Sequence, residues 1–382
     1  MASTANPDLT AAVRTALSRV EDPEIRRPIT ELGMVDRLEV TADGVADVRV
    51  LLTVAGCPMR ERLTTDVTAA VSAVPGVQDV RLELGVMSDE QRTELRTKLR
   101  GDNPVNEIPF AQPGSRTRVY AVASGKGGVG KSSVTVNLAV ALAQRGLQVG
   151  VLDADIYGFS VPRMLGVTGK PTQVDKMIMP PQAEGGVKVI SIGMFTPGNT
   201  AVVWRGPMLH RALQQFLADV YWGDLDVLLM DLPPGTGDIA ISLAQLVPSA
   251  ELLVVTTPQL AAREVAERAG SIALQTHQQI VGVVENMSWL EQPDGSRLEL
   301  FGAGGGQAVA DSLSEATGTR VGLLGQIPIE VAIREGGDAG TPIVADGQDS
   351  PAARAIGAIA DILAGRQRSL VGRSLGLSAA AR

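Results

Sequence analysis

A glycine-rich loop between a strand and a helix sets the narrowest limits on the fold of this chain. The segment Gly125–Ser132 reads GKGGVGKS, which matches the pattern GxxxxGK followed by Ser or Thr. It follows an apolar run over 119–123 and precedes a helical pattern over 133–143, the order that the motif requires. Glycines let backbone N–H groups turn toward phosphate oxygens, and the helix start adds positive partial charge. The segment therefore predicts a site for nucleotide phosphates.

Three side chains of this loop have distinct expected roles. We expect Lys131 to reach the β- and γ-phosphates and Ser132 to bind Mg²⁺. Lys126 is not needed to bind phosphate within one chain, so we interpret it as a catalytic residue that acts on a second subunit's nucleotide, as an arginine finger does. A solvated lysine is the alternative for Lys126. The residues expected to contact the nucleotide are Gly125, Lys126, Gly127, Gly128, Val129, Gly130, Lys131, Ser132 and Ser133.

Carboxylates end two of the predicted strands. Asp153 and Asp155 lie at the end of the strand expected over 148–153, and Asp231 ends the strand expected over 226–231. Ligands bind at the carboxyl edge of parallel sheets. We therefore expect Asp153 and Asp231 to hold Mg²⁺, partly through water, and Asp155 to orient the attacking water in catalysis. A solvated sheet edge is the alternative for Asp153 and Asp155.

The loop after Asp231 reads LPPGTGD over 232–238. Gly235 and Gly237 supply the backbone freedom and the N–H groups with which a loop senses a γ-phosphate. We interpret this loop as a nucleotide-dependent switch, and a rigid turn is the alternative.

Short β-rich runs alternate with helical segments from Arg118 onward, a pattern typical of parallel βαβ units. Several of the runs are apolar throughout, as strands buried on both faces must be. The sequence therefore predicts an α/β fold with a doubly wound, mostly parallel sheet. The expected strands are 118–123, 148–153, 187–192, 226–231, 251–257, 280–285 and 321–326.

A smaller α+β module is predicted before this sheet. Helices are expected over 8–20, 59–74 and 88–100, and strands over 37–41, 47–54 and 78–85. The stretch 101–117 is rich in proline and has little periodicity, so we interpret it as a linker. The predicted domains are 1–100 and 118–365, followed by a flexible tail over 366–382.

The composition excludes several classes of protein. The chain has a single cysteine, Cys57, so neither an intrachain disulfide nor a four-thiolate site within one chain can form. The 34 Lys and Arg residues against 42 Asp and Glu residues give a formal charge of −8, which disfavours nucleic acid as a partner. The sequence predicts no membrane span, and Met1–Thr10 lacks the layout of a secretory signal, so a cytoplasmic location is expected.

Several motifs together resemble those of the Mrp/ApbC-type iron-sulfur cluster carriers, which belong to the deviant Walker A ATPases with MinD and ParA. The motifs of the ATPase part are 125–132, DADIYG over 153–158, DLPPGTGD over 231–238, TTPQ over 256–259 and VENMS over 284–288. The amino-terminal motifs resemble a small SufT-like domain that is often fused to these carriers. They are DPEI over 22–25, ELGMV over 31–35 and LTVAGCPM over 52–59.

This resemblance implies a nucleotide-gated homodimer that hydrolyses ATP slowly without a partner and transfers clusters to apoproteins, with assembly factors as further partners. It also implies that Asn286 contacts adenine, and a strand-capping role is the alternative. Such carriers usually place a CxxC pair after the 284–288 segment, and that spacing falls on Gln292 and Gly295 here. The usual ligands of a bridging 4Fe–4S cluster are therefore missing.

Two functions stay open on the sequence alone. Cys57 precedes a predicted helix and is either a reactive thiolate, which two copies could use to ligate a cluster transiently, or a small turn residue. The first function is an ATP-dependent iron-sulfur cluster carrier. The alternative is a cluster-free MinD/ParA-like ATPase that regulates or scaffolds protein partners.

Overall fold

The computed structural model describes residues 6–53, 59–100, 107–112, 114–155, 158, 160–195, 206–235, 238–259, 262–345, 347 and 349–366. The chain divides into two compact units. The first contains Met1–Val105, Pro171–Pro180 and Asp219–Tyr221, and the second contains Asn106–Lys170, Pro181–Ala218 and Trp222–Arg382. No helix in the described ranges combines the length and apolar character that crossing a membrane requires.

The first unit contains a three-stranded sheet in the order β1-β2-β3, with β1 antiparallel and β3 parallel to β2. Its helix α1 begins where the Asn6 side chain accepts a hydrogen bond from the Leu9 N–H (3.1 Å) and Pro7 takes the first helical position. The elements are α1 (Pro7–Leu17), β1 (Val35–Val40), β2 (Val45–Leu52), α2 (Arg60–Ser72), β3 (Asp79–Val86) and α3 (Asp89–Arg100). The predicted smaller α+β unit is therefore confirmed.

A hairpin from the middle of the chain completes the core of this first unit. Its strands are β6 (Thr172–Val174) and β7 (Met177–Met179), and the side chains of Val174, Met177 and Met179 are buried in the same apolar cluster as α1, α2 and β2. The sequence places this hairpin inside the predicted domain 118–365, whereas its packing places it with the first unit. Apolar contacts made far along the chain cannot be read from local periodicity.

The second unit contains the predicted doubly wound sheet, which is thereby confirmed. The described strands form one eight-stranded sheet in the order β12-β11-β10-β4-β9-β5-β8, with β13 paired to β11, and every pair is parallel except β11 with β12. The strands are β4 (Arg118–Ala123), β5 (Val149–Asp153), β8 (Lys188–Ser191), β9 (Val227–Asp231), β10 (Glu251–Thr256), β11 (Ile280–Glu291), β12 (Arg297–Leu298) and β13 (Leu323–Ile329).

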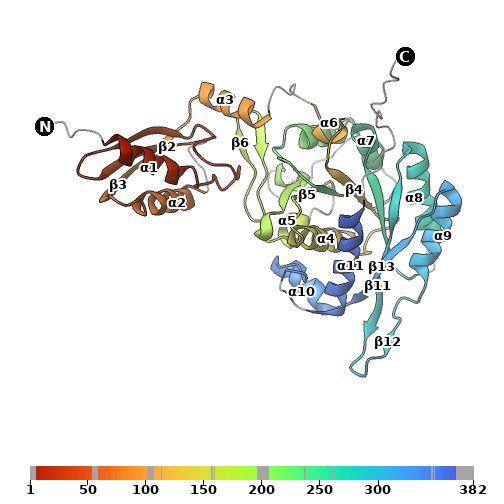
Figure 1. The fold of residues 1–382 in the computed structure, drawn as a ribbon. Coiled ribbons are helices and arrows are strands. Elements are labelled where there is room, and N and C mark those ends of the chain that lie inside the picture. The colour runs from red at the N-terminus through yellow and green to blue at the C-terminus, as the bar shows by residue number, and fades with distance from the viewer. Residues whose placement is uncertain are drawn as a thin grey trace, which may run out of the picture. The chain divides into compact units, whose positions relative to one another are not determined.

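Helices cover both faces of this sheet (Figure 1). Alternation along β10 shows why: Leu253 and Val255 are buried with α4 and α11, whereas Val254 is buried with α9 on the other face. The helices are α4 (Lys131–Gln144), α5 (Val161–Met164), α6 (Gly206–Ala218), α7 (Asp238–Leu246), α8 (Ala262–Thr276), α9 (Gly305–Thr317), α10 (Val331–Ala339) and α11 (Pro351–Gly365). Three short 3₁₀ turns are η1 (Pro109–Ala111), η2 (Glu184–Gly186) and η3 (Ile192–Phe195).

Candidate nucleotide-binding site

The phosphate loop joins the central strand β4 to helix α4, as the sequence predicts. Gly128 and Gly130 have φ angles of +79° and +77°, a region that glycine adopts without the penalty of a Cβ. Helix α4 begins at Lys131, directly after Gly130. Glycine-rich loops that end at a helix start are typical sites where backbone N–H groups bind phosphate oxygens.

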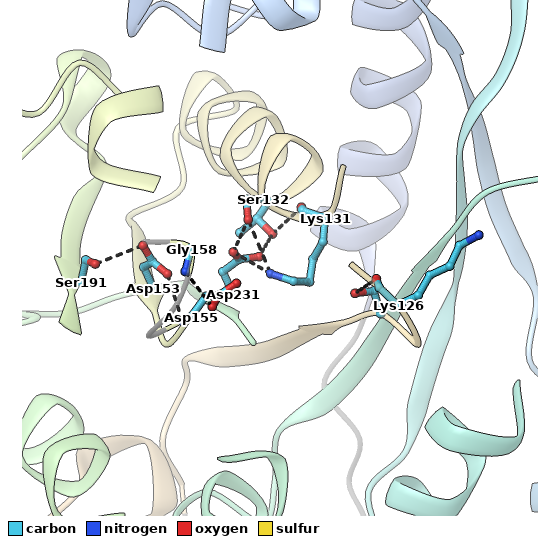
Figure 2. A network of polar contacts seen from close by, with 10 residues as sticks. Lys126, Lys131, Ser132, Asp153, Asp155, Gly158, Ser191 and Asp231 are labelled. Atoms are coloured by element: carbon cyan, nitrogen blue, oxygen red, sulfur yellow. Dashed lines mark hydrogen bonds and ion pairs between the residues drawn. The ribbon is translucent and has the colours of Figure 1, made fainter. Parts of the chain in front are cut away.

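Three side chains of α4 bond to Asp231, the last residue of β9. Figure 2 shows two of them, Lys131 and Ser132, beside Asp231. The Lys131 ammonium lies 2.7 Å from one carboxylate oxygen of Asp231, and the Ser132 hydroxyl donates to the same oxygen at 2.5 Å. Thr135 donates to the other oxygen at 2.8 Å. Lys131 and Asp231 are both buried, so this ion pair is largely shielded from water. The structure thus brings together Lys131, Ser132 and Asp231, which the sequence assigns to phosphate and metal.

Thr135 is a member of this network that the sequence reasoning missed. It lies four residues after Lys131, which places both side chains on one face of the helix. Its hydroxyl also reaches back to the Lys131 carbonyl (3.0 Å). This four-residue spacing from Lys131 was the sequence signal that could have identified Thr135.

Asp153 and Asp155 lie beside this network and have different partners. The Asp153 carboxylate accepts hydrogen bonds from the Asp155 N–H (3.1 Å) and the Ser191 hydroxyl (3.0 Å). Burial, with a further contribution from the negative charge of Asp231, raises the pKa of Asp153 to about 7. The Asp155 carboxylate accepts the Gly158 N–H at 3.1 Å. The solvated edge that was the alternative for this pair is wrong, because both side chains are buried.

Lys126 points away from the Lys131–Asp231 ion pair (Figure 2). Its ammonium donates a hydrogen bond to the side-chain oxygen of Gln259, which follows β10. Lys126 is half-buried, and its partner belongs to the same chain. The structure therefore does not bring the Lys126 ammonium to Lys131 and Asp231, and its predicted action on a second subunit stays a prediction.

The loop after Asp231 is hydrogen-bonded to the strand and loop that carry the phosphate motif. The Leu232 N–H donates to the Val122 carbonyl (3.1 Å), and the Gly235 N–H donates to the Ser124 carbonyl (2.9 Å). Residues 236 and 237 lie outside the described residues. The predicted switch role of this loop stays a prediction.

Asn286 lies against the phosphate loop. The residue is buried, and its side-chain amide donates to the Val129 carbonyl at 2.9 Å. Its predicted contact with adenine stays a prediction.

A hairpin made by the end of β11, the turn 292–296 and β12 occupies the position where the resemblance places two cysteines. Gln292 and Gly295 close its turn, because the Gly295 N–H donates to the Gln292 carbonyl at 2.9 Å. The Asp294 carboxylate accepts the N–H (2.9 Å) and the hydroxyl (2.6 Å) of Ser296. Cys57 lies outside the described residues. Among the residues that are described, no group of three or more His, Cys, Asp or Glu side chains is arranged to hold a metal ion.

Comparison with known proteins gives matches over both units. The family model described as NUBPL iron-transfer P-loop NTPase matches residues 115–364, and the model described as iron-sulfur cluster assembly protein matches residues 10–84. The iron-sulfur cluster carrier protein of Mycobacterium tuberculosis is 66% identical over 377 residues, which cover 99% of each chain. That of Deinococcus radiodurans is 44% identical over 357 residues, which cover 93% of this chain and 95% of the other.

A solved structure supports the fold. The nucleotide-binding protein from Archaeoglobus fulgidus, in complex with ADP, has a TM-score of 0.51 and 34% identity, and the match covers 66% of this chain and 91% of that chain. The resemblance predicted from the motifs is therefore confirmed. Because the family model covers most of the chain and the relatives match nearly all of it, this protein belongs to the NUBPL iron-transfer P-loop NTPase family.

Proposed function

We propose that this protein binds and hydrolyses ATP at the phosphate loop and transfers iron-sulfur clusters to apoproteins in the cytoplasm. The observation that carries the proposal is the convergence of Lys131, Ser132 and Thr135 on Asp231, in a family of iron-transfer NTPases. The relatives named as cluster carriers and the ADP complex of the Archaeoglobus fulgidus protein support the two halves of the proposal.

The residues around Asp231 fit a hydrated Mg²⁺ ion. Mg²⁺ prefers oxygen ligands and keeps several waters. The Ser132 hydroxyl bonds to the Asp231 carboxylate, and Asp153 is the residue paired with Asp231 on the neighbouring strand, so the three side chains supply oxygen donors to one region. When bound, the ion would neutralise phosphate charge. A triphosphate would compete with Asp231 for the Lys131 ammonium, because that ammonium already lies 2.7 Å from a carboxylate. Asp155 is the residue we assign to orienting the attacking water.

Completion of the site by a second copy is the next part of the proposal. We assign Lys126 to the γ-phosphate of the partner's nucleotide, where a cation stabilises charge that develops during transfer. Gln259 holds the Lys126 ammonium within its own chain, so action in trans requires that hydrogen bond to break. This requirement supports slow turnover until two copies and a partner protein come together.

Lys126→Ala tests the trans assignment. We expect Mg²⁺-ATP affinity to change less than about threefold and turnover to fall about 100-fold or more, by analogy with arginine fingers. Titration calorimetry and phosphate release measure the two quantities, with Gln259→Ala as a matched control that removes the cis partner of Lys126 and keeps the cation. Unchanged turnover in Lys126→Ala would remove this residue from catalysis.

The hairpin favours a second candidate function. Gln292 and Gly295 supply no thiolates where the carriers usually do, and Cys57 is the only cysteine of the chain. The alternative is a cluster-free ATPase switch or scaffold that regulates protein partners. If a cluster is bound, we assign one ligand from each of two copies to Cys57, with further ligands from a recipient or an assembly factor.

One experiment separates the two functions. The protein would be co-expressed with cluster-assembly machinery and purified without oxygen, and its absorption, its iron content and transfer to an apoprotein would be measured with and without ATP. We expect a bound cluster and ATP-dependent transfer, with iron lost in Cys57→Ala. No cluster and no transfer would favour the switch, and equal iron in Cys57→Ala would remove Cys57 as a ligand.

A further inference from the structure

The amide of Asn286 fixes the orientation of one peptide unit of the phosphate loop. Its Nδ2 atom donates to the Val129 carbonyl oxygen at 2.9 Å, and the residue is only 6% exposed. Gly130 approaches so closely that a Cβ built on it would lie 2.2 Å from this Nδ2 atom. The absence of a side chain at Gly130 therefore permits the contact, in addition to permitting the φ angle of +77°.

Because a peptide unit is planar and trans, the contact with the Val129 carbonyl also fixes the direction of the Gly130 N–H. The Val129 carbonyl and the Gly130 N–H belong to the same peptide unit and point in opposite directions. Because Asn286 holds the carbonyl on its own side, the Gly130 N–H faces away from Asn286. Gly130 is the residue directly before helix α4, where backbone N–H groups of a phosphate loop bind phosphate oxygens.

The strand segment that carries Asn286 is itself held firmly. The neighbouring Glu285 is 1% exposed, and its carboxylate accepts the Gly306 N–H of α9 (2.6 Å) and the Gln326 amide of β13 (2.7 Å). Asn286 is paired in the sheet with Ile327 of β13. The donor that orients the loop is therefore anchored to two other elements and has little freedom to follow the loop if the loop moves.

We propose that Asn286 is a positioning residue that holds the Val129–Gly130 peptide with its N–H available to a polyphosphate, whichever base the nucleotide carries. This inference rests on the proposed nucleotide-binding function and adds a role to the adenine contact considered above. A buried carbonyl that loses its donor costs free energy, and the loop relaxes to satisfy it elsewhere. Removal of the amide should therefore weaken binding of the phosphates themselves.

Asn286→Ala and Asn286→Leu test this role, since both lack the donor and Leu keeps nearly the bulk of Asn. Calorimetry of the full chain with Mg²⁺ would use two probes, ATP and inorganic tripolyphosphate, which has no base. We expect both variants to bind both probes about tenfold more weakly, because one buried hydrogen bond is lost.

The matched control is Ser288→Ala, which removes a buried hydroxyl of the same strand that bonds to Glu285 rather than to the loop. Its affinity for tripolyphosphate should stay within about twofold of the wild type, since its hydroxyl makes no bond to the loop.

The comparison of ATP with tripolyphosphate, which has no base, decides between a positioning role and an adenine contact. Weaker ATP binding with unchanged tripolyphosphate binding would overturn the positioning role and leave only an adenine contact. Unchanged binding of both probes would overturn it as well, as would an equal loss in Ser288→Ala, because the effect would then belong to the strand in general. If the wild type binds neither ATP nor tripolyphosphate, the proposed nucleotide-binding function is overturned, and the positioning role with it.

Discussion

Strand β11 passes through two regions that differ in how their polar side chains are held. At Glu285 and Asn286, each side chain is buried and bonded to another element. At the hairpin, residues 291–300 are all exposed, and the polar contacts of the turn 292–296 lie within the turn itself. The side chains at the nucleotide end of the strand (Glu285 and Asn286) are thus bonded to other parts of the unit, whereas we expect the hairpin end (291–300) to tolerate substitution, because exposed surface positions usually do. We therefore expect substitutions in the hairpin to leave the nucleotide site unchanged.

The largest expected effect is a loss of nucleotide affinity caused by a substitution near the nucleotide end of β11. Lys131→Ala removes the ammonium expected to hold the β- and γ-phosphates, so we expect Mg²⁺-ATP affinity to fall at least about 100-fold. The same change leaves the Asp231 carboxylate buried without its cation, at a cost of about 3 kcal/mol. Calorimetry measures the first effect and thermal unfolding the second.

Lys126→Ala is the control for that experiment, because it removes a lysine of the same loop that is bonded to Gln259 and not to Asp231. An equal loss of affinity in both variants would show that loop charge in general, rather than the Lys131 ammonium, holds the nucleotide.

The hairpin end should accept new ligands without harm to the nucleotide end. Gln292→Cys combined with Gly295→Cys restores the spacing that the resemblance assigns to a cluster carrier. A Cβ at Gly295 meets no atom of the described residues within 4 Å, although its φ of +81° strains any other residue, by about 1 kcal/mol. We expect anaerobic reconstitution to give several-fold more iron and sulfide than the wild type, with unchanged ATP affinity.

The matched control replaces the same two residues with serine, which has a similar size and no thiol. Equal iron in the cysteine and serine variants would mean that the hairpin is not a ligand site, and altered ATP affinity would mean that the two ends of β11 are coupled.

The phosphate loop, the parallel sheet and the position of Asp231 were predictable because each follows from local patterns. The loop motif lies between a strand and a helix, and strands buried on both faces are mostly apolar. Thr135 was within reach of the same reasoning, because helical spacing places it beside Lys131. Spacing alone identifies groups that share a face of one element.

Contacts between distant segments were not predictable from local patterns. The bond from Asn286 to Val129 joins residues 157 positions apart, and the bond from Lys126 to Gln259 joins residues 133 positions apart. The hairpin 172–179 likewise completes a core formed mainly by residues before 100. Such pairings depend on the order of strands in the sheet and on the packing of whole units, which local sequence patterns do not determine.

A further effect, near the nucleotide site, is the pH dependence of stability that Asp153 should cause. Burial beside Asp231 raises the pKa of Asp153 to about 7. The folded state therefore binds the carboxyl proton of Asp153 more tightly than the unfolded state does. Protonated Asp153 contributes to the free energy of unfolding in full below pH ~4. This contribution is lost as the pH rises through 7, at up to about 1.4 kcal/mol per pH unit. Asp153→Asn has no titrating proton, and its amide oxygen can still accept the Asp155 N–H while its NH₂ donates to the Ser191 hydroxyl.

We therefore expect the unfolding temperature of Asp153→Asn, relative to the wild type, to increase between pH 4 and pH 8, by about 8 °C. Thermal unfolding across this range measures the difference, and Asp294→Asn in the exposed hairpin turn serves as the control. A constant difference between Asp153→Asn and the wild type would contradict a raised pKa at Asp153.

The smallest effect is expected at the exposed end. The Arg297 guanidinium lies 3.9 Å from the ring centroid of Trp289 and joins the two strands of the hairpin. At an exposed site this contact contributes about 0.5–1 kcal/mol, so Arg297→Ala should speed local amide hydrogen exchange over 289–298 about two- to fivefold. Exchange in helix α4, which carries Lys131, should not change, because the hydrogen bonds described for the hairpin turn stay within the turn. Faster exchange in α4 would show that the hairpin and the phosphate loop share stability, and the contrast between the two ends of β11 would then be wrong.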